Sequence, residues 1–518
     1  MGKHVNLDAM FGREDFACED NGLTSYDKID KISVRSLKSF ARVLKKPDFQ
    51  RETNHWTPHQ VAYLLECYVT GDLIPSVILW QSNSNIFVID GGHRLSALRA
   101  WVEDDYGDRH LSQKMFGNEI SRDQIEAAEK TRKLVEEKIG SWEDFEKLAE
   151  LEDNELTDKQ KSMHHIVESR GLSIQWVSGD EEKAQASFFN INMKGTPLDD
   201  LEELLLRHRK RPVAIAARAI IRAGKGHRYW SRFDNEKGKK IEEIAKRLHT
   251  LLFDPEVKSP VKTLDLPLGG AKGLRTAIKV LIEFILISIK NQKNMCPEIK
   301  DHDEDLDGQA TIDVLLKAEK LASRITGNIK GSLGLHPAIY YYGPSGKHSS
   351  PMFLGTMSLI ASKLAVNDKD YFKKFTEVRL GLESTLVEHK TLLATLIQKP
   401  MSSKRVQHYQ DILKEIIDAL LANQQVTENK LIELSGMTGK VFEGTHKTTS
   451  SKISADIKSR VFIHTALKSA IKCPQCDGFI DTEKSVSYDH KNPVRNGGSS
   501  YSGNIQLMHP YCNQSIKC

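Results

Sequence analysis

The 518-residue chain lacks a long apolar stretch, a strong net charge and an evenly spread set of cysteines. Its longest apolar run, Val280 to Ile289, contains Glu283 and is too short to cross a bilayer. The first residues, MGKHVNLDAMFGREDF, have no apolar core of the kind that a signal peptide needs. These absences predict a soluble, cytoplasmic protein and exclude a membrane as its partner.

A dominant charge sign is missing too, because 74 Lys and Arg stand against 70 Asp and Glu. The net charge of +4 does not by itself indicate a nucleic-acid partner, so basic patches have to be judged locally. One patch runs from Arg207 to Arg232, where nine Lys and Arg occur without an acid and Tyr229 and Trp230 stand among them. It is typical of a DNA contact and equally of a solvated helix face.

The seven cysteines are distributed in a way that excludes a secreted disulfide framework. Cys18, Cys67 and Cys296 stand alone, whereas the other four crowd the last stretch. Cys473-x-x-Cys476 has the spacing of a zinc knuckle, and His509-x-x-Cys512 repeats it. Two such pairs suit a closed tetrahedral Zn²⁺ site, which would supply much of the folding free energy of a small module. A redox pair is the alternative for the first two cysteines.

The order of apolar and charged segments predicts an α+β multidomain protein. Residues 74–80 and 85–90 predict two strands, and residues 93–101 a helix directly after them. Mostly helices are expected over 201–398, followed by a linker at 400–405. We therefore expect an α/β N-terminal domain at 1–200, a helical domain at 201–400, and a region at 401–518 that ends in a small module with its core at 470–518.

The residues between the two ligand pairs resemble a known family. CPQC, SYDHKNPVRNGG and GNIQLMHPYCN follow one another as in HNH endonucleases of the zinc-stabilised ββα-metal type. The resemblance implies hydrolysis of DNA phosphodiester bonds, which needs an activated water and a cation near the leaving oxygen. In this family the Asp and the last Asn bind the catalytic metal, and the middle Asn orients the base.

Carried onto this chain, the resemblance gives each residue a role. His490 is expected to be the general base, because a neutral imidazole suits that task near pH 7. Asp489 and Asn513 offer oxygen atoms to Mg²⁺ or Mn²⁺, and Asn504 takes the orienting position. His509 stands where most relatives have Cys, and the chain leaves barely more than one turn after Cys512 for the closing helix. The alternative is a zinc module that has lost its activity.

A second candidate site lies at Asp90-Gly91-Gly92-His93-Arg94, between a predicted strand and a predicted helix. Glycines allow a ligand to approach the backbone, the helix N-terminus attracts phosphate, and an Arg pairs with phosphate bidentately. Many Gly-Gly turns merely connect elements, which is the plainer interpretation.

The surrounding segments PDFQRETNHW, LIPSVILW, VIDGGHRLSAL and FFNINMKGTPLDDLE resemble ParB-like domains with a DGQQR or DGQHR motif, which head GmrSD-type modification-dependent restriction proteins. The resemblance implies binding of a nucleoside triphosphate and its hydrolysis, although Gly92 replaces the first Gln of the motif. The other residues expected at this pocket are Gln50, Arg51, Asn192 and Lys194.

Both resemblances together predict a restriction or anti-phage endonuclease whose N-terminal domain senses a nucleotide, a DNA modification or both. Its expected partners are foreign or modified DNA, a nucleotide, and further copies of the chain or other defence proteins. The first alternative is a DNA-binding regulator or partition-like NTPase whose zinc module only binds nucleic acid. The second is an NTPase whose C-terminal module acts on RNA.

Overall fold

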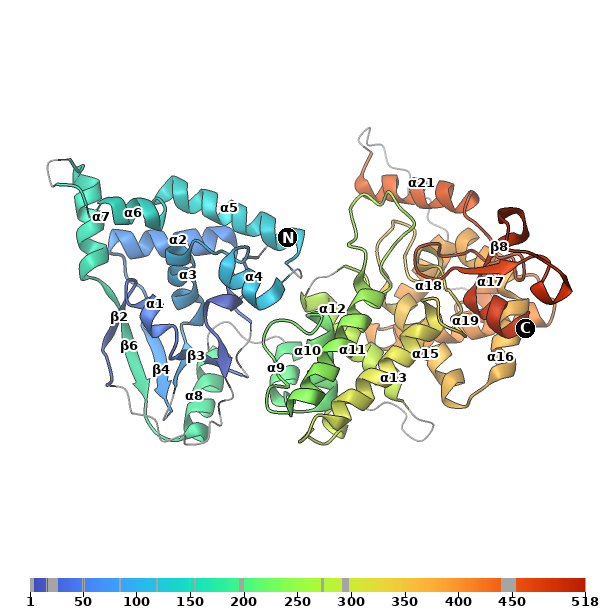
Figure 1. The fold of residues 1–518 in the computed structure, drawn as a ribbon, viewed down its shortest axis with the longest axis horizontal. Coiled ribbons are helices and arrows are strands. Elements are labelled where there is room, and N and C mark those ends of the chain that lie inside the picture. The colour runs from blue at the N-terminus through green and yellow to red at the C-terminus, as the bar shows by residue number, and fades with distance from the viewer. Residues whose placement is uncertain are drawn as a thin grey trace. The chain divides into compact units, whose positions relative to one another are not determined.

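The structure is a computed structural model, and it describes residues 4–14, 16, 27–48, 50, 52–82, 85–117, 120–148, 150–152, 155–194, 200–271, 274–290, 298–438 and 453–517. The chain divides into two compact units (Figure 1). The first unit holds Met1–Arg209 with Lys225–Tyr229, and the second holds Lys210–Gly224 with Trp230–Cys518. The helices after residue 230 and the cysteine-rich end therefore lie in one unit.

The first unit is built on a six-stranded mixed sheet in the order β1-β3-β5-β4-β6-β2. β5 lies near its centre, parallel to β3 and antiparallel to β4. The predicted strands at 74–80 and 85–90 are confirmed as β4 and β5. The strands are β1 (Arg13–Glu14), β2 (Lys31–Ser33), β3 (Leu44–Pro47), β4 (Val77–Gln81), β5 (Ile86–Asp90) and β6 (Gly171–Val177).

Side chains of β5 alternate between two apolar cores, one on each face of the sheet. Ile86 and Val88 belong to the larger core, whereas Phe87 and Ile89 belong to a smaller one with Phe188 of α8. This period of two explains why the strand reads as a continuous apolar run, since both of its faces are covered.

Helices cover the sheet. α2 illustrates why they begin where they do: Thr57 and Gln60 form a capping box, Pro58 occupies the first turn, and Gly71 ends the helix with φ of 86°. The helices of this unit are α1 (Leu37–Phe40), α2 (Pro58–Thr70), α3 (Gly92–Glu103), α4 (His110–Phe116), α5 (Arg122–Lys138), α6 (Trp142–Leu148), α7 (Asp158–Ser169), α8 (Glu181–Lys194) and α9 (Asp200–Arg207).

The second unit is mainly helical, as the sequence predicts for this region. The run from Val280 to Ile289 lies inside α12, where Phe284 and Ile285 are fully buried. Its helices are α10 (Pro212–Ile221), α11 (Asn235–Phe253), α12 (Leu274–Ile289), α13 (Gln309–Ile325), α14 (Pro337–Tyr340), α15 (Ser350–Ala365), α16 (Lys369–Glu377), α17 (Arg379–Glu388), α18 (Lys390–Gln398), α19 (Arg405–Leu421), α20 (Glu428–Leu434) and α21 (Ala455–Lys468).

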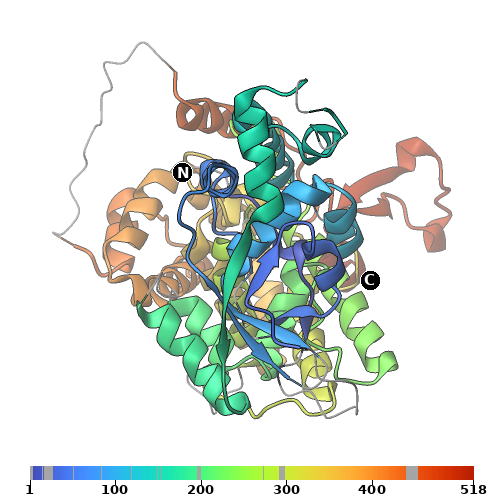
Figure 2. The same cartoon turned by 90° about the vertical axis from the view of Figure 1, so that its left-hand side faces the viewer.

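Within the described ranges, every helix falls short of the length or the apolar character that a membrane span requires. The second unit ends in an antiparallel hairpin of β7 (Ser487–His490) and β8 (Ile505–Met508), drawn in red in Figure 2. A short π-helix, Cys512–Ile516, follows the hairpin. These elements hold the candidate site.

Candidate active site and metal centre

Four buried ligand groups meet at the base of the hairpin. The ligand atoms of Cys473, Cys476, His509 and Cys512 all lie within 4.8 Å of one another. The hairpin and the π-helix bring the second pair to the first, although more than thirty residues separate Cys476 from His509. Three thiols and one imidazole at this separation are the donor set of a structural Zn²⁺ site.

The first ligand pair sits on a tight turn. The N–H of Asp477 donates to the carbonyl of Cys473 (2.8 Å), and the N–H of Cys473 donates to that of Gly478 (2.9 Å). A Cβ at Gly478 would lie only 2.5 Å from Nε of Arg379, so this position admits no side chain. The turn therefore depends on glycine for a close approach to a neighbouring helix.

The orientation of His509 fits a metal ligand. Its Nε2 lies 3.0 Å from the carbonyl oxygen of Phe479, which only accepts, so Nε2 carries the ring proton. Nδ1 then presents its lone pair to the thiols and lies 3.3 Å from Sγ of Cys476. Burial, together with the charge of Arg379, lowers the pKa of His509 and keeps the ring neutral, as metal binding requires.

A buried ion pair fastens this turn to the helices. Arg379 and Glu383 of α17 are 1% and 0% exposed, and Nε of the arginine lies 2.7 Å from Oε1 of the glutamate. Oε2 of Glu383 accepts the N–H of Phe479 (2.7 Å). Because the carbonyl of Phe479 holds His509, a chain of hydrogen bonds joins α17 to the ligand cluster.

Asp489 and His490 end β7, opposite Gln506 and Ile505 of β8. Burial works against the charge of Asp489, but the Lys517 ammonium and the Gln506 amide outweigh it and lower the pKa of its carboxyl. His490 is partly exposed, and its Nε2 lies 2.9 Å from Oγ of Ser500. The end of β7 thus carries a charged carboxylate and, on the next residue, a partly exposed imidazole.

Asn504 is buried and fastens the loop between the two strands. Its Oδ1 accepts the N–H of Asn492 (2.8 Å), and its Nδ2 donates to the carbonyls of Asn492 (3.1 Å) and Ser499 (2.8 Å). Ser499 precedes the serine that contacts His490. Asn504 therefore acts on His490 indirectly, by fixing the loop that carries Ser500.

Asn513 is held against β7, on the π-helix. Its Nδ2 donates to Oγ of Ser487 (2.7 Å) and to the carbonyl of Tyr488 (3.1 Å). Ser487 and Asp489 are two residues apart on one strand and so share a face. The short closing helix thus places Asn513 on the face of Asp489.

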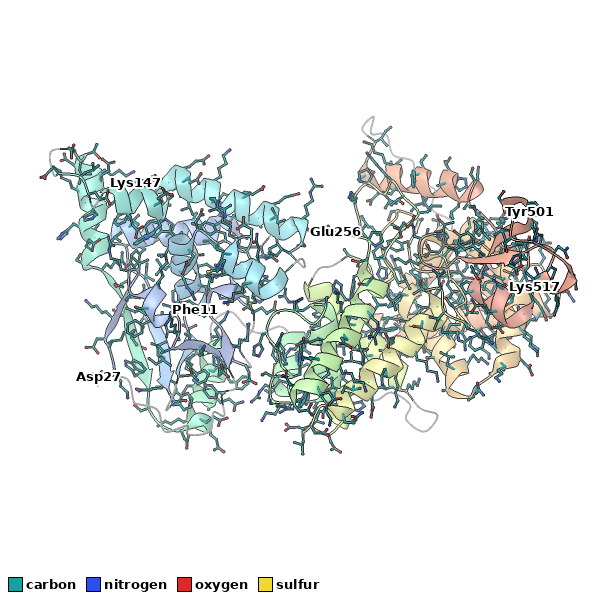
Figure 3. All side chains as sticks on the ribbon, viewed as in Figure 1. Phe11, Asp27, Lys147, Glu256, Tyr501 and Lys517 are labelled. Atoms are coloured by element: carbon teal, nitrogen blue, oxygen red, sulfur yellow. The ribbon has the colours of Figure 1, made fainter. Side chains whose placement is uncertain are left out.

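Lys517 is a residue of this site that sequence reasoning missed. Its ammonium contacts Oδ2 of Asp489 and donates to the main-chain carbonyl of His490 (2.7 Å). Figure 3 labels it at the end of the chain. A cation held by a carboxylate and a carbonyl is a stand-in for a metal ion, so the site fits a divalent cation. The signal available in the sequence was a Lys one helical turn after Asn513.

In the first unit, the loop after β5 has the expected form but a different set of contacts. Gly91 has φ of 93°, and a Cβ there would lie 2.6 Å from Val77, so only glycine fits. Nη2 of Arg94 lies 2.6 Å from Oδ2 of Asp90 and 3.1 Å from the carbonyl of Ser76. The arginine is therefore engaged within the protein.

The other residues predicted near this loop are placed as follows. His93 stacks on Trp56, with 5.3 Å between ring centroids. Gln50 is 9% exposed and lies 3.6 Å from the position that a Cβ on Gly92 would take; its Nε2 donates to the carbonyl of Val88. Arg51 and the side chains of Asn192 and Lys194 lie outside the described residues.

A buried ion cluster next to Gln50 escaped the sequence analysis. The carboxylate of Asp8 contacts Nη1 of Arg13, Nζ of Lys46 (2.8 Å) and the N–H of Thr53 (3.0 Å). Burial, opposed by the attraction of Asp8, lowers the pKa of Lys46 to about 8. Nε of Arg13 donates to the Gln50 carbonyl (3.3 Å), so the cluster supports the backbone beside the loop.

The basic patch from Arg207 to Arg232 is largely engaged in the fold. Trp230 is 1% exposed and donates to Glu242. In the second unit, Arg211 donates to the carbonyls of Lys300 and His302. These contacts favour the structural interpretation of the patch.

Two segments of the chain match known protein families, and these matches define the class of protein. Residues 473–517 match the family described as HNH endonuclease, which covers the ligand cluster and the hairpin. Residues 32–208 match the family described as GmrSD restriction endonuclease, N-terminal domain. No curated protein and no solved structure matches the chain. The chain thus joins a GmrSD-type N-terminal domain to an HNH endonuclease domain, as expected, which supports a DNA-cleaving hydrolase of the restriction type.

Proposed function

We propose that this protein is a metal-dependent DNA endonuclease in which His490 is the general base and the N-terminal domain regulates cleavage. The observation that carries the proposal is that Asp489 and His490 follow one another at the end of β7, with the Lys517 ammonium against the carboxylate of Asp489. An imidazole beside a carboxylate that already attracts a cation is what metal-assisted phosphodiester hydrolysis requires.

The roles of the chain's own residues follow from their contacts. With the proton of His490 on Nε2 and donated to Ser500, Nδ1 accepts a proton from water. Asn504 holds the loop that carries Ser500 and so keeps the ring in place. Asp489 and Asn513 would hold Mg²⁺ or Mn²⁺, which when bound neutralises charge on the leaving oxygen. The Cys473, Cys476, His509 and Cys512 cluster would hold Zn²⁺ and keep the hairpin folded.

A nicking assay tests the nuclease. Supercoiled plasmid is incubated with wild type and with His490→Ala, with Mg²⁺, with Mn²⁺ and with EDTA. Loss of a general base lowers the rate by ~10²–10⁴-fold, whereas His464→Ala, an exposed histidine on α21, should cut normally. Equal cutting by His490→Ala and wild type would end this assignment and leave the DNA-binding regulator as the better function. Parallel RNA substrates decide the remaining alternative.

We also propose that the first unit is ParB-like and binds a nucleotide at Asp90 to Arg94. The loop stands at the N-terminus of the 12-residue helix α3, where amide N–H groups attract phosphate. Oε1 of Gln50 is buried without a hydrogen-bond partner among the described residues and lies beside Gly92. A buried acceptor in this position favours a ligand that brings a hydrogen-bond donor, such as a sugar hydroxyl.

Nucleotide titration of wild type and Arg94→Ala, alongside plasmid cleavage, tests this second proposal. A charge-assisted contact of ~1.5–3 kcal/mol predicts a loss of affinity of ten-fold or more, and an altered response of cleavage to nucleotide. Arg122→Ala, an exposed position on α5, serves as the control. Absence of nucleotide binding by the wild type would refute the phosphate role of this loop and favour DNA recognition there.

A further inference from the structure

A groove of about 1110 Å³ opens on the second unit between α11, α13 and residues 326–331. α11 and α13 run side by side in Figure 1, in green and yellow. Cationic side chains outnumber acidic ones on its walls, where the only carboxylates are Glu243 and Glu319 among the residues that the structure describes. The cations are Lys246, Arg247, Lys320, Arg324 and Lys330.

The two arginines build the walls of the groove. Nε of Arg247 lies 2.6 Å from Oε1 of Glu319, so this pair is neutral. Arg324 donates to the carbonyl of Gly331 (2.8 Å) and lies over the ring of Phe372, 4.7 Å from its centroid. Neither arginine is therefore positioned to serve a ligand without giving up an internal contact.

The three lysines differ from the arginines. Lys246, Lys320 and Lys330 are exposed, and within the described part of the chain they make no ion pair. Their ammonium groups flank a groove whose exposed apolar side chains include Leu316 and Ile329. Mobile point charges around an apolar floor suit a polyanion with sugar surfaces better than a small anion, which needs fixed converging donors.

One wall of the groove is bonded directly to the segment that enters the catalytic hairpin. The N–H of Gly327 donates to Oγ of Ser485 (2.9 Å), and Oδ1 of Asn328 accepts the N–H of Val486 (2.8 Å). From Val486 to His490 the strand covers about 13 Å, at roughly 3.3 Å per residue. This length corresponds to roughly four base pairs of B-DNA.

We propose that this groove binds the phosphate backbone of duplex DNA a few base pairs from the bond that His490 attacks, through Lys246, Lys320 and Lys330. The inference rests on the proposed nuclease function and adds the surface that positions its substrate. Phosphate contacts of this kind fix the position of a duplex without reading its sequence.

The test is DNA affinity of the full-length protein in EDTA, where no cleavage occurs, by fluorescence anisotropy of a labelled 30-base-pair duplex across a salt series. The variant is Lys246→Gln/Lys320→Gln/Lys330→Gln. The control replaces three exposed lysines that do not line the groove: Lys369→Gln/Lys374→Gln/Lys414→Gln. Circular dichroism and zinc content confirm that both variants are folded.

The groove variant should bind at least ten-fold more weakly at moderate salt. The slope of log K against log salt should fall by about 2–3, roughly 0.9 for each lost phosphate contact. The control should keep the wild-type slope. Unchanged affinity and slope in the groove variant would overturn the proposal, as would equal losses in both variants.

The plasmid assay on the same proteins distinguishes a failure of the groove proposal from a failure of the proposed nuclease function. Wild type that binds DNA through the groove but never nicks plasmid would refute the nuclease and leave the groove standing. Wild type that nicks plasmid, with a groove variant that binds like wild type, would refute the groove alone. Competition by inorganic phosphate at low concentration would also count against it, because it would indicate a small-anion site.

Discussion

Lys517 places its ammonium against the carboxylate of Asp489 and the carbonyl of His490, so the chain itself supplies a cation at the head of the hairpin. A divalent metal bound at Asp489 would lie close to this ammonium and would be repelled by it. Metal binding and the Lys517 contact are therefore in competition.

Lys517→Met should raise the affinity of the metal-free protein for Mn²⁺. An ion pair of this partial exposure is worth ~0.2–1 kcal/mol, so the dissociation constant should fall by up to roughly five-fold. Isothermal titration or Mn²⁺ EPR measures the change directly, without relying on activity. Lys517→Arg keeps the charge and should bind Mn²⁺ like wild type; weaker binding by Lys517→Met would show that the lysine assists the metal.

Cys473→Ser and Cys512→Ser should each lose bound zinc and destabilise the C-terminal module, because the ligand cluster also forms its small core. Metal analysis and thermal unfolding check this expectation. Cys67→Ser, which changes a buried cysteine of the first unit, is the matched control and should keep its zinc. Stoichiometric zinc in both cluster variants would show that the site is misread.

Glu383→Leu should destabilise the second unit by about 3–5 kcal/mol, because it leaves the charge of Arg379 buried without its partner. The double variant Arg379→Met/Glu383→Leu should recover part of the loss, since no charge is then stranded. Denaturant unfolding and zinc retention are the measurements. Glu143→Leu, at an exposed pair with Lys147, should change neither. A double variant less stable than the single one would contradict this account.

The second unit should become more stable between about pH 7 and pH 10. Burial lowers the pKa of Lys390 from 10.5 to about 7, so in this window the unfolded chain holds a proton that the folded chain lacks. Unfolding free energy therefore rises with pH, by at most about 1.4 kcal/mol per unit for one proton. Lys390→Met should reduce the slope measured by urea unfolding at pH 7 and pH 9. Identical slopes would contradict the shifted pKa.

Local patterns predicted the parts of the site that depend on local geometry. The spacing of Cys473 and Cys476 fixes a turn, and the matching pair at His509 and Cys512 gives the rest of a tetrahedral set. Residues 85–90 could be assigned to a strand because four residues of high β propensity, Ile86 to Ile89, stand directly before an Asp-Gly-Gly turn.

Contacts between segments that are distant in the chain could not be predicted, because no local sequence pattern indicates them. The N–H of Phe479 reaches Glu383, 96 residues earlier, and neither residue carries a pattern that names the other. The role of Lys517 depends on whether the last turn is an α-helix or the wider π-helix, a difference set by packing on β7. Asp8 meets Lys46 only because β1, which follows Asp8 closely in the chain, pairs with β3.

Because hydrogen bonds run from α17 through Phe479 to His509, the nuclease module depends on the helices of the second unit for its structure. The turn at Cys473–Gly478 packs against α17, and the N–H of Tyr511, next to the last cysteine of the cluster, donates to the carbonyl of Ser332 in the loop after α13. Removal of residues 470–518 would expose Arg379 and Glu383 to water. On another scaffold, the transplanted segment would lack the carboxylate that accepts the N–H of Phe479. A rearrangement of α13 or α17 would therefore act directly on the ligand cluster, through the hydrogen bonds that join Phe479 to Glu383 and Tyr511 to Ser332.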